Sequence, residues 1–238
     1  MKRKLKIEIG LAVLLLLIAL FGSFLAPYDP LKVNYDFSLQ PPSFLHIFGT
    51  DKLGRDVFSR ILCGAKTSFG LTFLMLFLIV FIGMIVGLIA GLSNDKVESF
   101  FNNIINGLLA FPDTIFAIAI VGIVGAGLFN TVFALALIWW TKYARLTLAL
   151  VKQEKKKNYL VISKMSGVPP LQRIIRYLLP NILSQILVTA FLDIGNMMIS
   201  LAGLSFLGLA SQPPQPEWGA MLYESKQFMQ VAPWMMFF

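Results

Sequence analysis

The chain has 238 residues, of which 57% are hydrophobic and only 13% are charged, and its mean hydropathy is +0.77. Several uncharged runs exceed the roughly 18 to 20 residues needed to cross a bilayer, which excludes a soluble globular protein and predicts an all-α, polytopic membrane helical bundle. The formal net charge of +8 is unevenly spread, because nine of the twenty basic residues lie between Lys142 and Arg176. This is the positive-inside pattern of membrane proteins, so we expect no nucleic-acid partner.

The apolar runs predict five spans, and the basic N-terminus that precedes the first one is expected to lie inside the cell. In chain order the spans are about Ile9–Ala26, Phe69–Leu92, Phe101–Val124, Asn130–Leu150 and Leu178–Ala210. The last residues, 232–238, look like the first turns of a further span. We therefore expect a sixth helix that is cut off at the C-terminus, and a single transmembrane domain over residues 1–238.

The segment between the first two spans, residues 27–66, is expected to be extracytoplasmic and irregular because it contains four prolines. Near its end lies a short block with charges of both signs: Asp51, Arg55, Asp56 and Arg60. These side chains can form an ion-pair net that holds the entry of the second span. We expect this block to have a structural role rather than to bind substrate.

The second span carries a glycine at every fourth position, at Gly83, Gly87 and Gly91. This spacing places the three glycines on one helical face, where the missing side chains allow another helix to approach closely. We expect this face to be a helix–helix contact.

The third span is interrupted by Pro112 and Asp113. Proline removes one hydrogen bond of the helical ladder, and the aspartate can cap the exposed amides of the half-helix that follows. We favour this structural role for Asp113 over a role in transport.

A basic loop, about residues 152–180, separates the fourth and fifth spans. A short helix in it is expected to end at Gly167, which can adopt a positive φ, and a second helix is expected to begin at Pro169 and Pro170. Three side chains lie on one face of the first helix: Tyr159, Ile162 and Met165. The residues leave two readings open, a knob for the groove of a partner protein or an amphipathic loop on the membrane surface.

The chain carries no sequence pattern for ATP hydrolysis or for a cysteine–histidine metal site. It has no G-x-x-x-x-G-K-[ST] loop, so we expect that it is not an enzyme and that any ATPase is a separate subunit. Cys63 is the single cysteine and His46 the single histidine. We expect no cofactor bound by this chain and no firm metal site.

One ionisable residue, Asp193, lies in the middle of the fifth span. A charge in mid-membrane is costly, so such a residue is a functional-site hypothesis by default. Helical spacing puts three further polar or sulfur-bearing side chains near its face: Asn196, Met197 and Ser200. We expect a substrate pathway here, and Asp193 is a possible metal ligand. The alternative is a hydrogen bond from Asp193 to a neighbouring span.

The loop segment Asn158–Asn181 resembles the "EAA" loop of ABC-importer permeases, in which this loop docks on the ATP-binding subunit. Gly167 and the Leu179-Pro180-Asn181 run match the family pattern, whereas Val161 stands where the family has an acidic residue. The resemblance implies that the loop couples transport to ATP hydrolysis. The residues expected to do so are Tyr159, Ile162, Ser163, Lys164, Gly167, Leu179 and Pro180.

The charged block at residues 48–60 resembles the G-T-D-x-x-G-R-D-x-x-S-R signature of the dipeptide, oligopeptide and nickel permease subfamily. Its signature residues are Gly49, Thr50, Asp51, Gly54, Arg55, Asp56 and Arg60. The run Leu192–Met198 is similar to that of nickel-importing permease subunits. The resemblance therefore implies a permease that carries nickel, as a chelate, with di- or oligopeptides as the alternative cargo.

The same resemblance implies the partners and the location of the protein. We expect a second homologous permease forming a heterodimer, two ATP-binding subunits that use ATP and Mg, and an extracytoplasmic substrate-binding protein, all at the inner membrane of a bacterium. Alternating access around a midplane pathway is the expected mechanism. A non-transporting scaffold or sensor is the alternative class.

Overall fold

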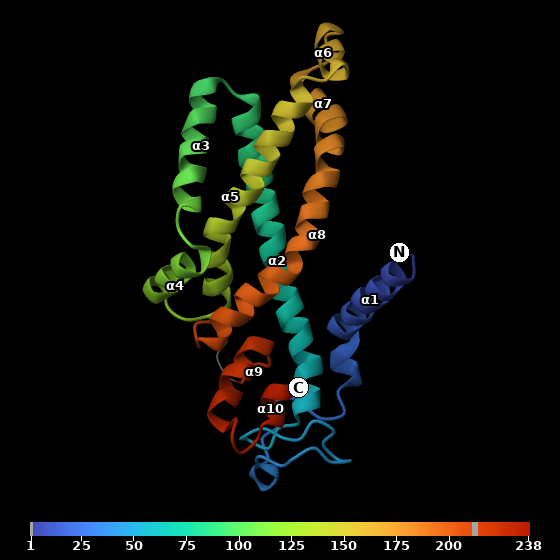
Figure 1. Cartoon of the computed structure of the whole chain (residues 1–238), viewed down its shortest axis with the longest axis vertical. Helices are drawn as coiled ribbons and strands as arrows, with labels where there is room; N and C mark the ends of the chain where they lie inside the picture. The colour runs from blue at the N-terminus through green and yellow to red at the C-terminus, as the bar shows by residue number, and fades with distance from the viewer. Residues whose placement is uncertain (1, 211–213) are drawn as a thin grey trace. The chain divides into compact units, whose positions relative to one another are not determined.

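The computed structural model describes residues 2–210 and 214–238, and within them the chain is helical, with an isolated antiparallel bridge between Thr50 and Asp56 as its only strand pairing (Figure 1). The helices follow in chain order. They are α1 (Lys2–Leu25), η1 (Tyr35–Phe37), α2 (Val57–Leu92), α3 (Asp95–Leu109), α4 (Asp113–Val124), α5 (Leu128–Lys155), α6 (Asn158–Met165), α7 (Pro170–Arg173), the π-helical η2 (Ile174–Leu178), α8 (Leu179–Phe206), α9 (Trp218–Ser225), η3 (Lys226–Phe228) and α10 (Trp234–Phe237).

The predicted all-α membrane fold is confirmed, but the spans differ from those expected. Among the described residues, three helices are long and apolar enough to cross a bilayer: Val57–Leu92, Leu128–Lys155 and Pro170–Phe206. The third of these is the continuous helical run of α7, η2 and α8. The expected first span corresponds to α1, whose described apolar part is Val13–Leu25.

The expected third span is two helices, α3 and α4, which meet at 87° (Figure 1). The break falls at Pro112, where a proline cannot donate a hydrogen bond to the preceding turn. The Asp113 carboxylate accepts a hydrogen bond from the Thr114 amide at 2.8 Å, which satisfies one free donor at the start of α4. The predicted interruption is confirmed, and it turns the chain through nearly a right angle.

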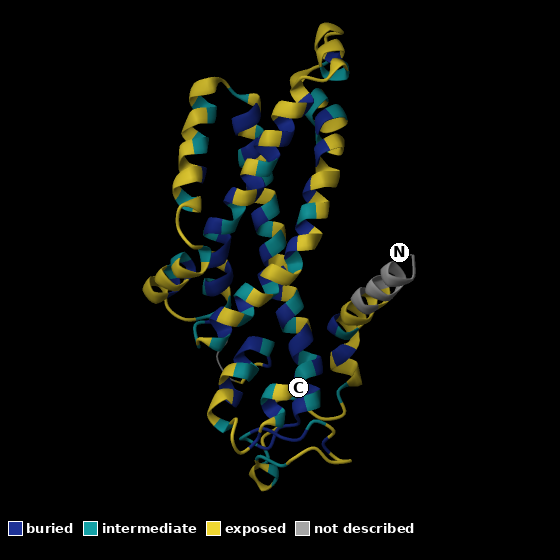
Figure 2. Cartoon of the chain, viewed as in Figure 1, coloured by how far each residue is buried: buried dark blue, intermediate teal, exposed yellow. Residues whose placement is uncertain are grey.

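The chain divides into two compact units, which are described separately. Unit 1 comprises Met1–Thr72, Val124–Thr131 and Met198–Phe238, and unit 2 comprises Phe73–Ile123 and Val132–Met197. Helix α5 supplies much of the core of unit 2. In its most apolar window 61% of residues are buried, compared with 28% for α2 and for the α7–α8 run (Figure 2).

The glycine face of α2 is the contact between α2 and α5 in unit 2. A Cβ on Gly87 would lie 2.5 Å from the Thr147 Cβ and 2.6 Å from the Ala144 carbonyl oxygen. Added Cβ atoms on Gly83 and Gly91 would likewise come within 3 Å of α5. The predicted close approach is confirmed, because α5 lies so near to α2 that any side chain at these positions would collide with it.

Unit 1 begins α2 twelve residues before the expected span, at Val57 instead of Phe69. The cause is a cap: Asp56 accepts hydrogen bonds from the Ser59 amide at 2.8 Å and the Ser59 hydroxyl at 2.7 Å. A capped helix start needs no apolar side chains. At about 1.5 Å per residue, the 36 residues of α2 extend about 54 Å, which exceeds the roughly 30 Å hydrocarbon core.

The C-terminal part of unit 1 is folded into short helices, and the further span expected at residues 232–238 stays a prediction. It contains α9, η3 and α10, and Met235 of α10 is buried against Val57 and Ala232. The Phe238 ring stacks on Phe48 with 4.1 Å between ring centroids. Residues 232–238 therefore pack against the beginning of α2.

The close approach of α2 and α5 predicts that Gly87→Ala destabilises the protein by about 1–3 kcal/mol, because the added methyl group cannot be accommodated against a backbone carbonyl. The matched control is Gly70→Ala, also within α2, where an added Cβ meets nothing within 4 Å. Alanine at Gly70 is expected to be neutral or to stabilise the helix by up to about 1 kcal/mol. Thermal unfolding of the detergent-solubilised chain measures the stability of both variants, and equal unfolding midpoints for Gly87→Ala and Gly70→Ala would contradict the α2–α5 contact.

Candidate functional site

The signature block forms a buried ion-pair net in unit 1. Arg55 donates through Nε to Asp51 at 2.6 Å and through Nη2 to Glu224 at 2.8 Å. Arg60 lies 3.6 Å from the same Asp51 carboxylate and 3.5 Å from the same Glu224 carboxylate. All four side chains are buried, so two guanidinium groups and two carboxylates compensate one another where water cannot.

The predicted net wrongly included Asp56 and left out Glu224. The Asp56 carboxylate forms no ion pair with either arginine; it caps α2 and lies 2.9 Å from Nδ1 of His46. Glu224 takes the place expected for Asp56 and comes from α9. No local pattern pointed to Glu224, since it is 169 residues from Arg55 in the chain.

The uncharged signature residues shape the loop that precedes α2. Gly49 and Gly54 have φ of 72° and 70°, values that favour glycine. An added Cβ on Gly54 would lie 1.7 Å from the Asn34 carbonyl oxygen. Thr50 is buried, and its hydroxyl accepts a hydrogen bond from the Gln40 amide at 2.8 Å. These contacts support the structural role expected for the block.

Asp193 pairs with α5 in unit 2. Its carboxylate accepts hydrogen bonds from Lys142 Nζ at 2.8 Å and 2.7 Å, one to each oxygen, and from the Tyr143 hydroxyl at 2.9 Å. Asp193 is buried, whereas the Lys142 side chain is 49% exposed. The structure therefore has the hydrogen bond between Asp193 and a neighbouring helix that was the alternative to a substrate site.

The Asp193–Lys142 pair lines a cavity of about 270 Å³ in unit 2. The cavity also receives Asp113 from α4 and Asn196 from α8, and its other lining residues are Leu109, Phe111, Ile138, Trp139 and Thr141. Of the four residues expected to share a pathway face, Asp193 and Asn196 line this cavity. Met197 is buried and does not line it, and Ser200 belongs to unit 1.

Sequence reasoning missed Lys142 as the partner of Asp193, because its charge was counted with the basic loop. A signal was available, since Lys142 lies within the expected fourth span. Two opposite charges in two apolar spans are expected to pair, because each alone is costly in hydrocarbon. The described residues contain no group of three or more His, Cys, Asp or Glu side chains that could hold a metal ion.

The loop after α5 folds as predicted at its glycine. Helix α6 ends at Met165, and Gly167 has φ of 75°, while the Val168 amide donates to the Ser163 carbonyl at 3.1 Å. The positive φ reverses the chain and satisfies carbonyls at the end of α6. Ser163 is buried, whereas Ile162 and Met165 are 59% and 82% exposed, so an apolar edge of α6 faces outward.

Glu154 anchors α6 to the end of α5. Its carboxylate accepts hydrogen bonds from Lys157 at 2.6 Å and from the Tyr159 hydroxyl. Burial, together with the hydrogen bond to Glu154, raises the pKa of Tyr159 to about 12. The phenol therefore stays protonated at neutral pH and continues to donate this hydrogen bond.

The Leu179-Pro180 pair begins α8, directly after the π-helical turn η2. Pro180 has no amide hydrogen to donate into this turn, and widened π-helical turns accommodate such breaks. The side-chain amide of Asn181 donates to the Tyr177 carbonyl at 2.6 Å, one turn earlier in the helix.

Comparison with known proteins gives one family for most of the chain. Residues 83–238 match the family described as "Binding-protein-dependent transport system inner membrane component", and residues 9–42 match "N-terminal TM domain of oligopeptide transport permease C".

Relatives with curated names divide between two cargoes. The di/tripeptide transport system permease protein DppC of Pseudomonas aeruginosa is 38% identical over 94% of this chain and 77% of its own length. The dipeptide transport system permease protein DppC of Alkalihalophilus pseudofirmus is 38% identical over 100% of this chain and 78% of its own length. The nickel transport system permease protein NikC of Escherichia coli strain K12 is 34% identical over 94% of this chain and 81% of its own length.

The buried net predicts that Glu224→Gln destabilises the protein by about 3–5 kcal/mol, because two buried guanidinium groups lose a carboxylate that they share. Glu98→Gln is the matched control. Glu98 pairs with a half-exposed Lys152, so its loss is expected to cost less than about 1 kcal/mol. Thermal unfolding of the solubilised protein distinguishes the two, and similar losses would mean that the net does not stabilise unit 1.

Proposed function

The chain belongs to the family of binding-protein-dependent transport system inner membrane components, in the peptide and nickel ABC-importer subfamily, and from this premise we propose that it moves short peptides across the bacterial inner membrane. It acts as one of two homologous permeases in a heterodimer with two ATP-binding subunits. An extracytoplasmic binding protein delivers the cargo. ATP and Mg are used by the partner subunits, and the N-terminus of this chain lies inside the cell.

The pairing of Asp193 with Lys142 is the observation that favours peptides over a free metal ion. Both oxygens of the carboxylate accept hydrogen bonds from the same ammonium group. A positive charge at this distance opposes the approach of a divalent cation, and the described residues supply no cluster of ligands around it. This reverses the order of the two cargoes that the sequence alone favoured.

The cavity beside the pair suits a small molecule that carries both charges. Its lining includes Lys142, whose side chain is half-exposed, and the two acidic residues Asp113 and Asp193. A zwitterionic peptide can place its carboxylate near the lysine and its amino group near Asp113. Asp113 thereby gains a role in transport in addition to its role as a cap.

Nickel carried as a chelate is the second candidate. The run Leu192–Met198 is similar to that of nickel-importing permeases, and NikC of Escherichia coli aligns over 94% of this chain. A chelated ion needs no ligands from the protein, and the carboxylates of a chelator can bind an ammonium group as a peptide carboxylate does.

For coupling, we propose that the loop 152–180 docks on an ATP-binding subunit through the outward apolar edge of α6. The exposed Ile162 and Met165 side chains support this, since they have no use in the packing of unit 2. Movement of the ATP-binding subunits is then passed through α6 to α8, and the spans alternate in access around the cavity.

The cargo proposal predicts that cells expressing the full importer take up labelled dipeptide, and that Asp193→Asn lowers this uptake by about tenfold or more, because one partner of a buried charge pair is removed. Asp95→Asn, at an exposed position in the first turn of α3, is the matched control and is expected to leave uptake unchanged. If Asp193→Asn lowers expression, the charge-balanced double variant Asp193→Asn/Lys142→Met is expected to restore expression without restoring uptake.

Uptake of labelled nickel without peptide uptake by the unaltered importer would overturn the peptide assignment.

The coupling proposal predicts that Gly167→Pro abolishes co-purification with the ATP-binding subunit, because proline requires φ near −65° and Gly167 has φ of 75°. Gly167→Asn is the control, since asparagine tolerates positive φ and preserves the turn. Affinity purification of the tagged chain, followed by quantification of the ATPase, gives the readout. Association and uptake that both survive Gly167→Pro would refute coupling through this loop.

A further inference from the structure

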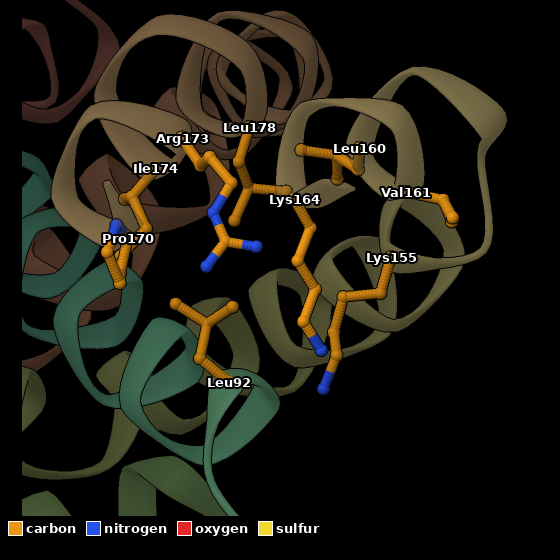
Figure 3. Close-up of a pocket in the computed structure, with 9 residues that line it drawn as sticks. All are labelled: Leu92, Lys155, Leu160, Val161, Lys164, Pro170, Arg173, Ile174 and Leu178. Carbon is orange, nitrogen blue, oxygen red and sulfur yellow. The ribbon is translucent and has the colours of Figure 1, made fainter. Parts of the chain in front are cut away.

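A second cavity in unit 2, of about 550 Å³, is lined by residues of the loop 152–180 and by the last residue of α2 (Figure 3). Its volume falls within the range of roughly 300–1,000 Å³ typical of small-molecule sites. It is separate from the cavity beside Asp193, with which it shares no lining residue.

Three cations line this cavity, and no acidic residue is among the described residues that do so. Lys155 ends α5, Lys164 lies in α6 and Arg173 ends α7. Figure 3 shows the Arg173 guanidinium group pointing into the cavity, and the Lys155 and Lys164 side chains extending toward it from two different helices. Glu154, the residue before Lys155 in the chain, is already engaged by Lys157 and Tyr159.

Among the described residues, the hydrogen-bonding capacity of these cations is largely unused. Lys155 Nζ donates to the Gly91 carbonyl at 3.0 Å. The Arg173 Nε atom is buried and has no hydrogen-bond acceptor among the described residues. A buried N–H without an acceptor is unfavourable, and three like charges around one space repel each other. An anion with several acceptor oxygens in the cavity removes the repulsion between the three cations, whereas the Nε atom, which is closed to solvent, does not face the cavity.

We propose that this cavity binds a phosphate group, and that its source is the headgroup of an anionic phospholipid. The inference rests on the proposed function, which places the loop and the helix ends at the cytoplasmic face. A phosphate offers acceptor oxygens in several directions, as the convergence of one guanidinium and two ammonium groups requires. Basic pockets between spans at that face are suited to lipid headgroups.

The apolar part of the lining distinguishes a lipid from free phosphate. Leu92, the last residue of α2, lines the cavity with Leu160 and Ile174. Apolar side chains beside cations match an amphiphile, whose phosphate meets the charges while the root of its acyl chains meets the leucines. A soluble anion would leave that apolar surface without a partner.

A bound headgroup would connect three segments through one ligand. Its oxygens would bridge Lys155 at the end of α5, Lys164 of α6 and Arg173 of α7. The loop would then be held to the ends of the spans by lipid as well as by Glu154. This makes the position of α6 sensitive to the lipid composition of the membrane.

The test uses the purified, delipidated full importer and counts bound lipid by native mass spectrometry during titration with short-chain phosphatidylglycerol. We expect Lys164→Gln/Arg173→Gln to weaken phosphatidylglycerol binding by about tenfold or more, since two of three cations are removed. Lys156→Gln is the matched control, because Lys156 is exposed and does not line the cavity. Phosphatidylcholine of the same chain length is expected to bind weakly to every variant.

Unchanged phosphatidylglycerol binding by the double variant, or equal binding of phosphatidylcholine, would overturn the proposal. Displacement of the lipid by inorganic phosphate at similar concentration would assign the site to a soluble anion and overturn the lipid source. Loss of the ATP-binding subunit with lipid binding intact would assign the three cations to protein docking. Co-purification of that subunit with the unaltered chain is measured in the same preparation, so failure of the proposed function is recognised independently.

Discussion

A charge that leaves water must find a compensating group within the protein, and this requirement organises both units of the chain. In unit 1 the cost of burying Arg55 and Arg60 is offset by Asp51 and Glu224. The charged signature therefore holds the first turn of α2 in place through buried ion pairs. In unit 2 the carboxylate of Asp193 is matched by Lys142 and Tyr143. The pairs made by Glu224 and by Asp193 join segments that are distant in the chain, so these charges select which helices pack together.

The same requirement separates the two cavities of unit 2. In the cavity beside Asp193 the cation Lys142 is paired with Asp193 and Asp113 adds a second carboxylate, so the lining carries charges of both signs, which suits a zwitterion better than a bare cation. In the second cavity the cations Lys155, Lys164 and Arg173 have no acidic counterpart among the described residues of the lining, which leaves the compensation to a ligand. One principle therefore indicates a cargo at the first cavity and an anionic lipid at the second.

Close packing supplies the framework on which these charges are held. Three glycines allow α5 to approach α2 so closely that side chains at those positions would overlap with it. Because α5 is packed in this way, Lys142 and Tyr143 are held beside Asp193. The end of the same helix positions Glu154 and Lys155 at the start of the loop. Helix α5 thus connects the proposed cargo site with the proposed coupling segment by a single rigid element of 28 residues.

Local patterns in the sequence were sufficient for the helical membrane class, the break at Pro112, the glycine contact of α2 and the positive φ of Gly167. Each of these depends on neighbouring residues, whose spacing and backbone preferences can be read directly. The sequence did not predict the start of α2 at Val57, because a polar cap at Asp56 sets this start and not the beginning of an apolar run. Glu224 lies 169 residues from Arg55, and Lys142 lies 51 residues from Asp193. The turn of 87° at Pro112 adds Asp113 to the lining of the Asp193 cavity. Only the tertiary structure decides such pairings, because the energy of a charge pair depends on distance in space and on burial, neither of which the order of residues specifies.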